Sequence, residues 1–159
     1  MTFTICGSIA FYPTMQQIQH DLEANGHRVL IPELTLPLPA QYGGERALNF
    51  DAFVQEHGGF ATFPPEHELW RHKGTAIQEH FAKIMNCDAL LIVNERKGDV
   101  DGYVGGNTLI EMGVGFFLKK SLYLLHQPSP ALRCLAEVYG MSPTVLNGDL
   151  SRLPPTISG

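Results

Sequence analysis

The chain has 159 residues, a length that fits one compact domain. Hydrophobic residues make up 44% of it and charged residues 17%, which excludes a disordered chain, a collagen and a coiled coil. The formal net charge is -5 and no basic patch is visible, so we expect no nucleic acid polymer as a partner.

The sequence shows no clear signal for a membrane span, for secretion or for disulfide bonds. No apolar run approaches the roughly 20 residues of a membrane span, and the N-terminus lacks the basic region of a signal peptide. The three cysteines show neither zinc nor disulfide spacing: Cys6, Cys87 and Cys134. We therefore expect core thiols in a reducing cytoplasm, with no membrane association.

A β-α-β unit opens the chain. Phe3–Cys6 favour a strand, and a capping box at Thr14 and Gln17 predicts a helix that ends at Gly26. Arg28–Ile31 then favour a second strand. Strands joined through a helix pair in parallel, so we expect these two to be parallel neighbours.

The next segment is harder to interpret. Prolines interrupt residues 33–65, and Glu45–His57 has a weak helical period, so we expect an insertion or lid with one helix. A better helical stripe covers Glu66–Asn86, where Gly74 favours a break or a kink.

The second half alternates strands and helices. Ala89–Val93 is a continuous apolar run, typical of a strand buried on both faces of a parallel sheet. The elements expected after it are a helix over Thr108–Leu118, a strand over Ser121–Leu125, a helix from Ser129 to Tyr139, a short strand over Thr144–Leu146 and a loose tail, 147–159.

Alternation throughout the chain predicts an α/β fold, in one domain over residues 1–159. We expect a doubly wound open parallel sheet of four or five strands with helices on both faces. Ligands of such sheets bind outside the carboxyl ends of the strands. The segments Gly7–Pro13 and Asn94–Asn107 follow two such ends and are the candidate ligand loops.

The loop Asn94–Gly106 is longer than the usual strand-to-helix loop. Gly105 and Gly106 would let the backbone approach a ligand closely, with the positive end of a helix behind them. The alternative is a mobile surface turn.

Glu111 is the single residue whose position most strongly suggests a function. It stands among apolar neighbours in the first turn of the expected helix, and a carboxylate there needs a reason. One reason is a capping box with Thr108. The other is a nucleophile or base at the ligand crevice, kept ionised by the helix N-terminus.

Smaller signals surround the first strand. Gly7 permits close approach, while Ser8 serves either a turn or a sugar or phosphate oxygen. No G-x-G-x-x-G follows, which argues against a dinucleotide. Phe11 and Tyr12 either stack on a base or pack the loop onto the core.

Histidines cluster between residues 67 and 80. His67, His72 and His80 lack the i, i+4 spacing of H-E-x-x-H, so we expect no metal, and no cofactor. His80 precedes the central strand by one helix. It either points toward the crevice or is a satisfied polar residue at a helix edge.

Three segments together resemble the nucleoside 2-deoxyribosyltransferase superfamily: Cys6–Ile9, Cys87–Val93 and Gly106–Gly115. That group includes deoxyribosyltransferases, 2′-deoxynucleoside 5′-phosphate N-hydrolases and CMP-type N-glycosidases. The resemblance implies that Glu111 attacks C1′ of the sugar and that the base leaves. Water would then complete a hydrolysis, or a second base a transfer, with retained configuration.

The resemblance also implies roles for other residues. His80 falls where the family has a carboxylate, and Asp101 is the nearest substitute for an acid or serine that this chain replaces by Gly105. Ala10 stands where members acting on monophosphates often have an arginine. The implied substrate-binding residues are Gly7, Ser8, Ile9, Phe11, Tyr12, Asn94, Gly105, Gly106 and Asn107.

We therefore expect an N-glycosidic-bond enzyme, hydrolase or deoxyribosyltransferase, whose partner is a small-molecule nucleoside or nucleotide. Its catalytic residues would be Glu111, His80 and Asp101. The resemblance further implies a homodimer or larger homo-oligomer. A non-catalytic nucleotide-binding module on the same fold is the main alternative. A structural protein whose glutamate only caps a helix is a weaker one.

Overall fold

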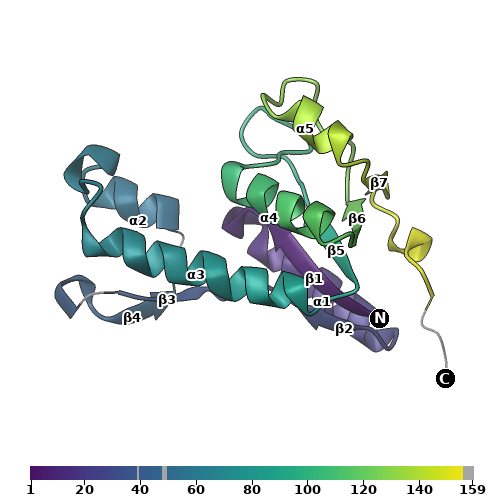
Figure 1. Ribbon diagram of the computed structural model, residues 1–159, viewed down its shortest axis with the longest axis horizontal. Coiled ribbons are helices and arrows are strands. Elements are labelled where there is room, and N and C mark those ends of the chain that lie inside the picture. Colours follow the sequence, from purple (N-terminus) through teal and green to yellow (C-terminus); the bar gives the residue numbers. More distant parts are fainter. Residues whose placement is uncertain (39, 48–49, 156–159) are drawn as a thin grey trace. The chain divides into compact units, whose positions relative to one another are not determined.

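The computed structural model describes residues 1–38, 40–47 and 50–155. The chain divides into two compact units, drawn in Figure 1. We call Met1–Ile31 with Phe81–Gly159 the sheet unit, and Pro32–His80 the inserted unit. No helix in the part of the chain that the structure describes combines the length and apolarity needed to cross a membrane.

The sheet unit is built on five parallel strands, which confirms the predicted sheet. These are β1 (Thr2–Gly7), β2 (Arg28–Leu30), β5 (Ala89–Val93), β6 (Ser121–Leu124) and β7 (Thr144–Val145). Their order is β2-β1-β5-β6-β7. The winding direction therefore reverses between β1 and β5, and the crevice at such a switch point is where ligands of these sheets bind.

Helices cover both faces of this sheet, as predicted. Ala89, Leu91 and Val93 of β5 share one core cluster with the apolar face of α1 (Tyr12–Ala24). Leu90 and Ile92 point the other way, as alternation along a strand requires, into a second cluster. Three helices line that second face: the end of α3 (Glu68–Met85), α4 (Gly106–Phe117) and α5 (Leu135–Gly140).

Helix α1 differs from its prediction at the N-terminus. It follows the 3-10 turn η1 (Ile9–Phe11), and its N-cap is Phe11 with no side-chain cap. The predicted Thr14–Gln17 capping box is therefore wrong. Pro13 stands in the first turn, where a missing N–H costs nothing, so the helix begins before Thr14. Gly26, at φ 82°, follows the C-cap Asn25 as predicted.

Helix α5 is shorter than expected. The Ser129 hydroxyl accepts a hydrogen bond from the Ala131 N–H at 3.1 Å, so it caps a local turn instead of the helix. The helix begins only at Leu135, after Cys134 as N-cap. The described tail is not loose, because 3-10 turn η4 (Leu150–Arg152) follows β7 and the Arg152 Nη1 donates to the Val145 carbonyl at 2.8 Å. Residues 156–159 lie outside the described residues.

The inserted unit holds more than the single predicted helix. An antiparallel pair, β3 (Thr35–Pro37) with β4 (Glu45–Ala47), precedes α2 (Phe50–Glu56). The helical period over Glu45–His57 was therefore right only for its second half, since pairing with β3 holds the first residues extended. The 3-10 turns η2 (Ala40–Tyr42) and η3 (Phe60–Thr62) complete the unit before α3, which runs through Gly74 unbroken.

A glycine in the β5–α4 loop gives the first prediction. Gly98 (φ 60°) and Gly102 (φ 57°) share a backbone conformation that favours glycine, but a Cβ meets nothing at Gly98 and overlaps the Gln127 carbonyl at Gly102. Both Ala variants carry the backbone strain, about 1 kcal/mol. Only Gly102→Ala adds a steric clash, so it should lose about 2–4 kcal/mol in chemical denaturation. Equal losses in the two variants would contradict the packing at Gly102.

Candidate active site

Two loops meet at the switch point of the sheet. Gly7 pairs with Val93 at the carboxyl ends of β1 and β5, and a Cβ at Gly7 would lie 2.6 Å from the Val93 carbonyl oxygen. Only glycine permits this approach. The loops beyond are joined directly, because the Lys97 Nζ donates a hydrogen bond to the Ser8 Oγ at 3.3 Å.

The position of Glu111 on α4 corrects the capping-box reading. The helix begins at Gly106, after Gly105 in an extended conformation (φ -88°, ψ 172°) with no side-chain cap, and the Leu109 N–H donates to the Gly105 carbonyl. Thr108 is thus inside the helix, and Glu111 lies in its second turn. The helix dipole acts mainly over the first turn, so it favours a charge at Glu111 less than we expected.

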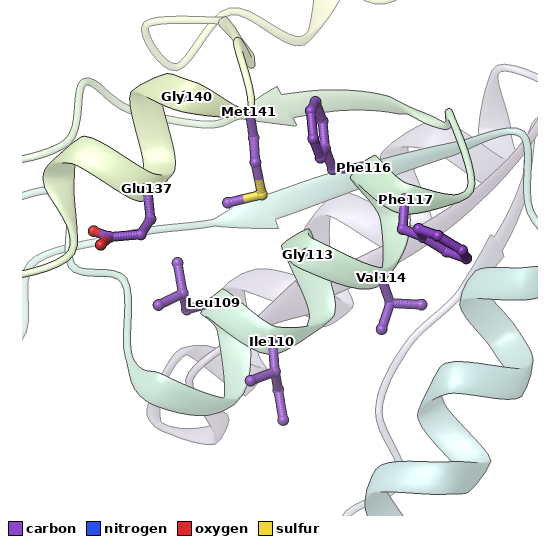
Figure 2. A pocket seen from close by; sticks show the side chains of 9 residues that line it. All are labelled: Leu109, Ile110, Gly113, Val114, Phe116, Phe117, Glu137, Gly140 and Met141. Carbon is purple, nitrogen blue, oxygen red and sulfur yellow. The ribbon is translucent and has the colours of Figure 1, made fainter.

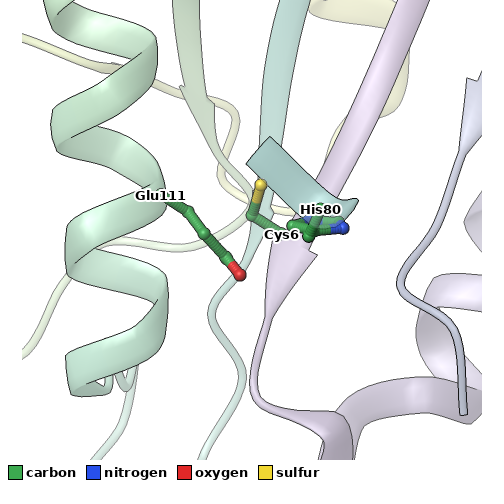
Figure 3. A group of neighbouring side chains, drawn as sticks. All are labelled: Cys6, His80 and Glu111. Carbon is green, nitrogen blue, oxygen red and sulfur yellow. The ribbon is translucent and has the colours of Figure 1, made fainter. Parts of the chain in front are cut away.

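Three side chains from separate elements meet near the carboxyl end of β1: Cys6 of β1, His80 of α3 and Glu111 of α4. Figure 3 shows Glu111 extending from α4 toward the other two. One donor atom from each lies within 4.8 Å of the others, and all three residues are buried, Glu111 being 7% exposed. A glutamate and a histidine that the sequence singled out separately are therefore neighbours.

The end of α3 is tied to the sheet unit on both sides. The Thr4 hydroxyl of β1 donates to the Lys83 carbonyl at 3.0 Å, and the Lys83 Nζ donates to the Ile31 carbonyl at 2.8 Å. His80 directly precedes Phe81 and lies one helical turn before Ile84, a buried member of the second core cluster. These bonds fix the turn of helix that carries His80.

Cys6 is the residue whose role the sequence missed. Burial first, and then the negative charge of Glu111, raise the pKa of the Cys6 thiol well above its ordinary value. The thiol thus keeps its proton and hydrogen-bonds the Glu111 carboxylate. We expected an inert core thiol. Its place at the carboxyl end of β1, two residues before Ser8, was the available signal.

The same cluster offers a metal-binding donor set. Thiolate, imidazole and carboxylate are all zinc ligands, and three protein ligands are the number typical of a catalytic zinc site. Motif spacing cannot find such a set, because its members come from three elements. His67, in contrast, has both ring nitrogens engaged, by the Tyr42 hydroxyl at 3.2 Å and the Leu69 N–H at 3.1 Å.

Other predicted residues take structural positions. Phe11 is buried in the first core cluster and Tyr12 packs against it, which favours the packing alternative for both. Asn94 is buried, donating to the His126 carbonyl at 2.8 Å and accepting from the His126 N–H at 2.9 Å. It braces the ends of β5 and β6 against each other.

Asp101 is not among the residues gathered at Glu111. Its carboxylate is 75% exposed and lies 3.7 Å from the Arg96 guanidinium. The aromatic ring of Tyr103 lies against Gly105, with its hydroxyl 3.1 Å from where a Cβ would stand. At Gly106, by contrast, a Cβ meets nothing within 4 Å, so that backbone is open. Asn107 is exposed beside it, and Ile9 is half-buried in η1.

A separate apolar groove of about 670 Å³ lies between α4 and α5 (Figure 2). It is lined by Leu109, Ile110, Gly113, Val114, Phe116, Phe117, Glu137, Gly140 and Met141. Phe117 is 82% exposed, and a Cβ at Gly113 meets nothing within 4 Å. The outer face of α4 therefore carries both a hollow and projecting aromatic rings.

Comparison with known proteins finds a solved structure with a similar fold. No family model and no curated protein matches the sequence. A solved structure of a 2-deoxyribosyltransferase from the psychrotolerant bacterium Bacillus psychrosaccharolyticus, described as a biocatalyst for nucleoside synthesis, is similar over 86% of this chain and 80% of its own, with a TM-score of 0.51 and 14% identity. The chain has the deoxyribosyltransferase-like fold. The predicted resemblance is thereby confirmed for the fold.

The coupling of Cys6 to Glu111 is open to direct titration. We expect the Cys6 thiol to keep its proton well above the roughly 8.5 of an unfolded cysteine. Removing the neighbouring charge in Glu111→Gln should lower the Cys6 pKa without restoring that value, because burial remains. The ¹³Cβ shift of labelled cysteine, followed against pH, measures both. A Cys6 pKa unchanged by the substitution would show that the charge of Glu111 does not act on the thiol.

Proposed function

We propose that the protein cleaves the N-glycosidic bond of a nucleoside or nucleotide, with Glu111 as the nucleophile. The supporting observation is the buried Glu111 carboxylate, oriented by Cys6 beside His80 on a deoxyribosyltransferase-like fold. A carboxylate nucleophile must be aimed and shielded from water, and both conditions are met by side chains from neighbouring elements.

In the first step a Glu111 oxygen bonds to C1′ while the C1′–N bond breaks. The base departs with the bonding electron pair and takes a proton, which His80 donates from its imidazolium form. A glycosyl ester on Glu111 remains. Cys6 acts as a positioning residue here, because its S–H donor holds one carboxylate orientation.

In the second step an acceptor attacks C1′ from the face that the base has left. Neutral His80 takes the proton of the attacking water, the ester bond breaks, and Glu111 leaves as a carboxylate. A second base in place of water gives transfer. Two inversions at C1′ retain the configuration. Asp101 would then act only through the shape of its loop, since its carboxylate pairs with Arg96.

Glu111→Gln tests the nucleophile. It is nearly isosteric, so the thermal midpoint should change little, while base release should fall at least about a thousandfold. Liquid chromatography measures free base from ribo- and deoxyribonucleosides and their 5′-monophosphates, and mass spectrometry seeks the ester on Glu111. Glu23→Gln, on the exposed face of α1, is the matched control and should keep full activity.

The outcomes separate the alternatives. Folded wild-type protein that releases no base from the panel contradicts the proposal, and nucleotide-induced thermal stabilisation without turnover then favours a binding module. Base release that survives in Glu111→Gln assigns the nucleophile elsewhere. If a chelator abolishes the activity and zinc restores it, Cys6, His80 and Glu111 are ligands of a metal ion, and Glu111 is not the nucleophile.

A homo-oligomer in a reducing cytoplasm remains our expectation, and a second copy of the chain is the proposed occupant of the α4–α5 groove. One helix face presents both the projecting Phe117 and the hollow at Gly113, which suits a self-complementary two-fold contact. Phe117→Glu should shift the mass in light scattering toward the monomer. Phe60→Glu, at a 55% exposed phenylalanine of the inserted unit, should leave it unchanged. A monomeric wild-type protein contradicts the expectation.

A further inference from the structure

The cluster of Cys6, His80 and Glu111 brings three kinds of metal ligand to one point. A sulfur, an imidazole nitrogen and a carboxylate oxygen all lie within 4.8 Å of one another. Figure 3 shows the Glu111 side chain running from α4 toward the other two. In a tetrahedral zinc site, bonds of about 2.0–2.3 Å set neighbouring ligand atoms about 3.5 Å apart. The difference of at most about 1.3 Å is within reach of small side-chain rotations.

The charges of the cluster suit a divalent cation. Cys6 as a thiolate and Glu111 as a carboxylate supply one negative charge each, and neutral His80 supplies none, so a doubly charged ion leaves the cluster without net charge. This balance matters because Cys6 is fully buried and the other two residues are 6% and 7% exposed. An uncompensated charge is costly at such a place, whereas a neutral set of ion and ligands is not.

The mixture of ligand atoms selects among divalent cations. Mg²⁺ and Ca²⁺ bind oxygen and need six or more ligands, which one carboxylate beside a thiol and an imidazole does not supply. Zinc accepts sulfur, nitrogen and oxygen together, and three protein ligands leave its fourth position to a water molecule. The cluster therefore fits Zn²⁺ and excludes the two harder ions.

Surrounding contacts hold the ligand atoms in place. The Thr4 hydroxyl, two residues before Cys6 on β1, donates to the carbonyl of Lys83, which lies three residues after His80 on α3. This hydrogen bond ties the strand that carries the thiol to the helix that carries the imidazole. Cys6 also shares the second core cluster with Met112 of α4. Ligands fixed in this way lose little conformational entropy when an ion binds, and the apolar residues around them limit access of water.

We infer that Cys6, His80 and Glu111 bind one Zn²⁺ ion and that the bound ion blocks the release of base. The block rests on the proposed function. On binding, the Cys6 S–H bond breaks, the sulfur keeps the electron pair and gives it to zinc, and the proton passes to solvent. Zinc also takes the electron pair with which Glu111 would attack C1′. A zinc-bound imidazole cannot form the imidazolium from which the departing base takes its proton.

Cobalt titration of the reduced protein tests the site without any substrate. Co²⁺ replaces zinc in such sites and gives a sulfur-to-cobalt charge-transfer band only when a thiolate is a ligand. We expect this band at one Co²⁺ per chain, and its loss when Zn²⁺, the tighter binder, is added. Cys6→Ser should abolish the band. Cys134→Ser, the same change at a half-buried cysteine outside the cluster, should keep it.

Glu111→Gln is the second variant, and it keeps the thiol. It should weaken cobalt binding at least about a hundredfold, because even a partner in the outer shell of a metal site is worth about 10- to 100-fold. Folded wild-type protein without the band overturns the site, as does a band that persists in Cys6→Ser. Cobalt that binds without the band is held by histidines elsewhere and overturns it too. Equal affinity in wild type and Glu111→Gln removes the carboxylate from the ligands.

Kinetics decide the block and separate it from the proposed function. Half-inhibition of base release should occur at the zinc dissociation constant found by competition with cobalt, and about ten times that concentration should slow release about tenfold. Mg²⁺ should have no effect, and a chelator should restore the rate. Undiminished release with the site filled overturns the block and leaves Glu111 catalysis standing. A Cys6-dependent cobalt band in protein that releases no base refutes the proposed function and leaves the zinc site standing.

Discussion

The pairing of β1 with β5 is the constraint on which the rest of the structure depends. Five residue pairs run in register from Phe3–Ala89 to Gly7–Val93. In the last pair only a glycine fits at position 7, because a Cβ there would overlap the Val93 carbonyl oxygen. This pairing creates the switch point, because the chain winds outward in opposite directions from these two strands. It sets Cys6 under α4 and Ser8 within reach of the loop that follows β5. A shift of one residue would turn Cys6 to the opposite face and separate it from Glu111.

Much of the sheet unit was predictable because its signals are local and repeated. An unbroken apolar run predicted the central strand, and alternation of strands with helical stripes predicted the doubly wound sheet, since both patterns follow directly from burial. Helix ends were predicted less well, at Thr14, Thr108 and Ser129. Each has a capping side chain that the backbone did not use, because a helix started earlier or a turn captured the hydroxyl. In the inserted unit, cross-strand pairing at Glu45–Ala47 overrode a weak helical period.

Two members of the candidate site, Glu111 and His80, were singled out from the sequence, but their arrangement was not. Glu111 stood out because a carboxylate in an apolar helix is unusual, and the loop glycines stood out by their position after strands. Cys6 and Lys97 were missed for opposite reasons. A buried cysteine has the composition of a core residue, and one lysine beside Arg96 in a polar loop looks like solvated surface. Only coordinates show that the first contacts a carboxylate and that the second reaches across to Ser8.

The hydrogen bond from the Lys83 ammonium to the Ile31 carbonyl bears on how long the inserted unit can be. Ile31 is where the chain departs from the sheet unit, and Lys83 stands just after its return at Phe81, so exit and re-entry are fastened together. The entropic cost of closing a loop between two such fixed ends grows only slowly with the length of the loop. A change in the length of the inserted unit would therefore cost the sheet unit little stability, as long as the connection from Lys83 to Ile31 is kept.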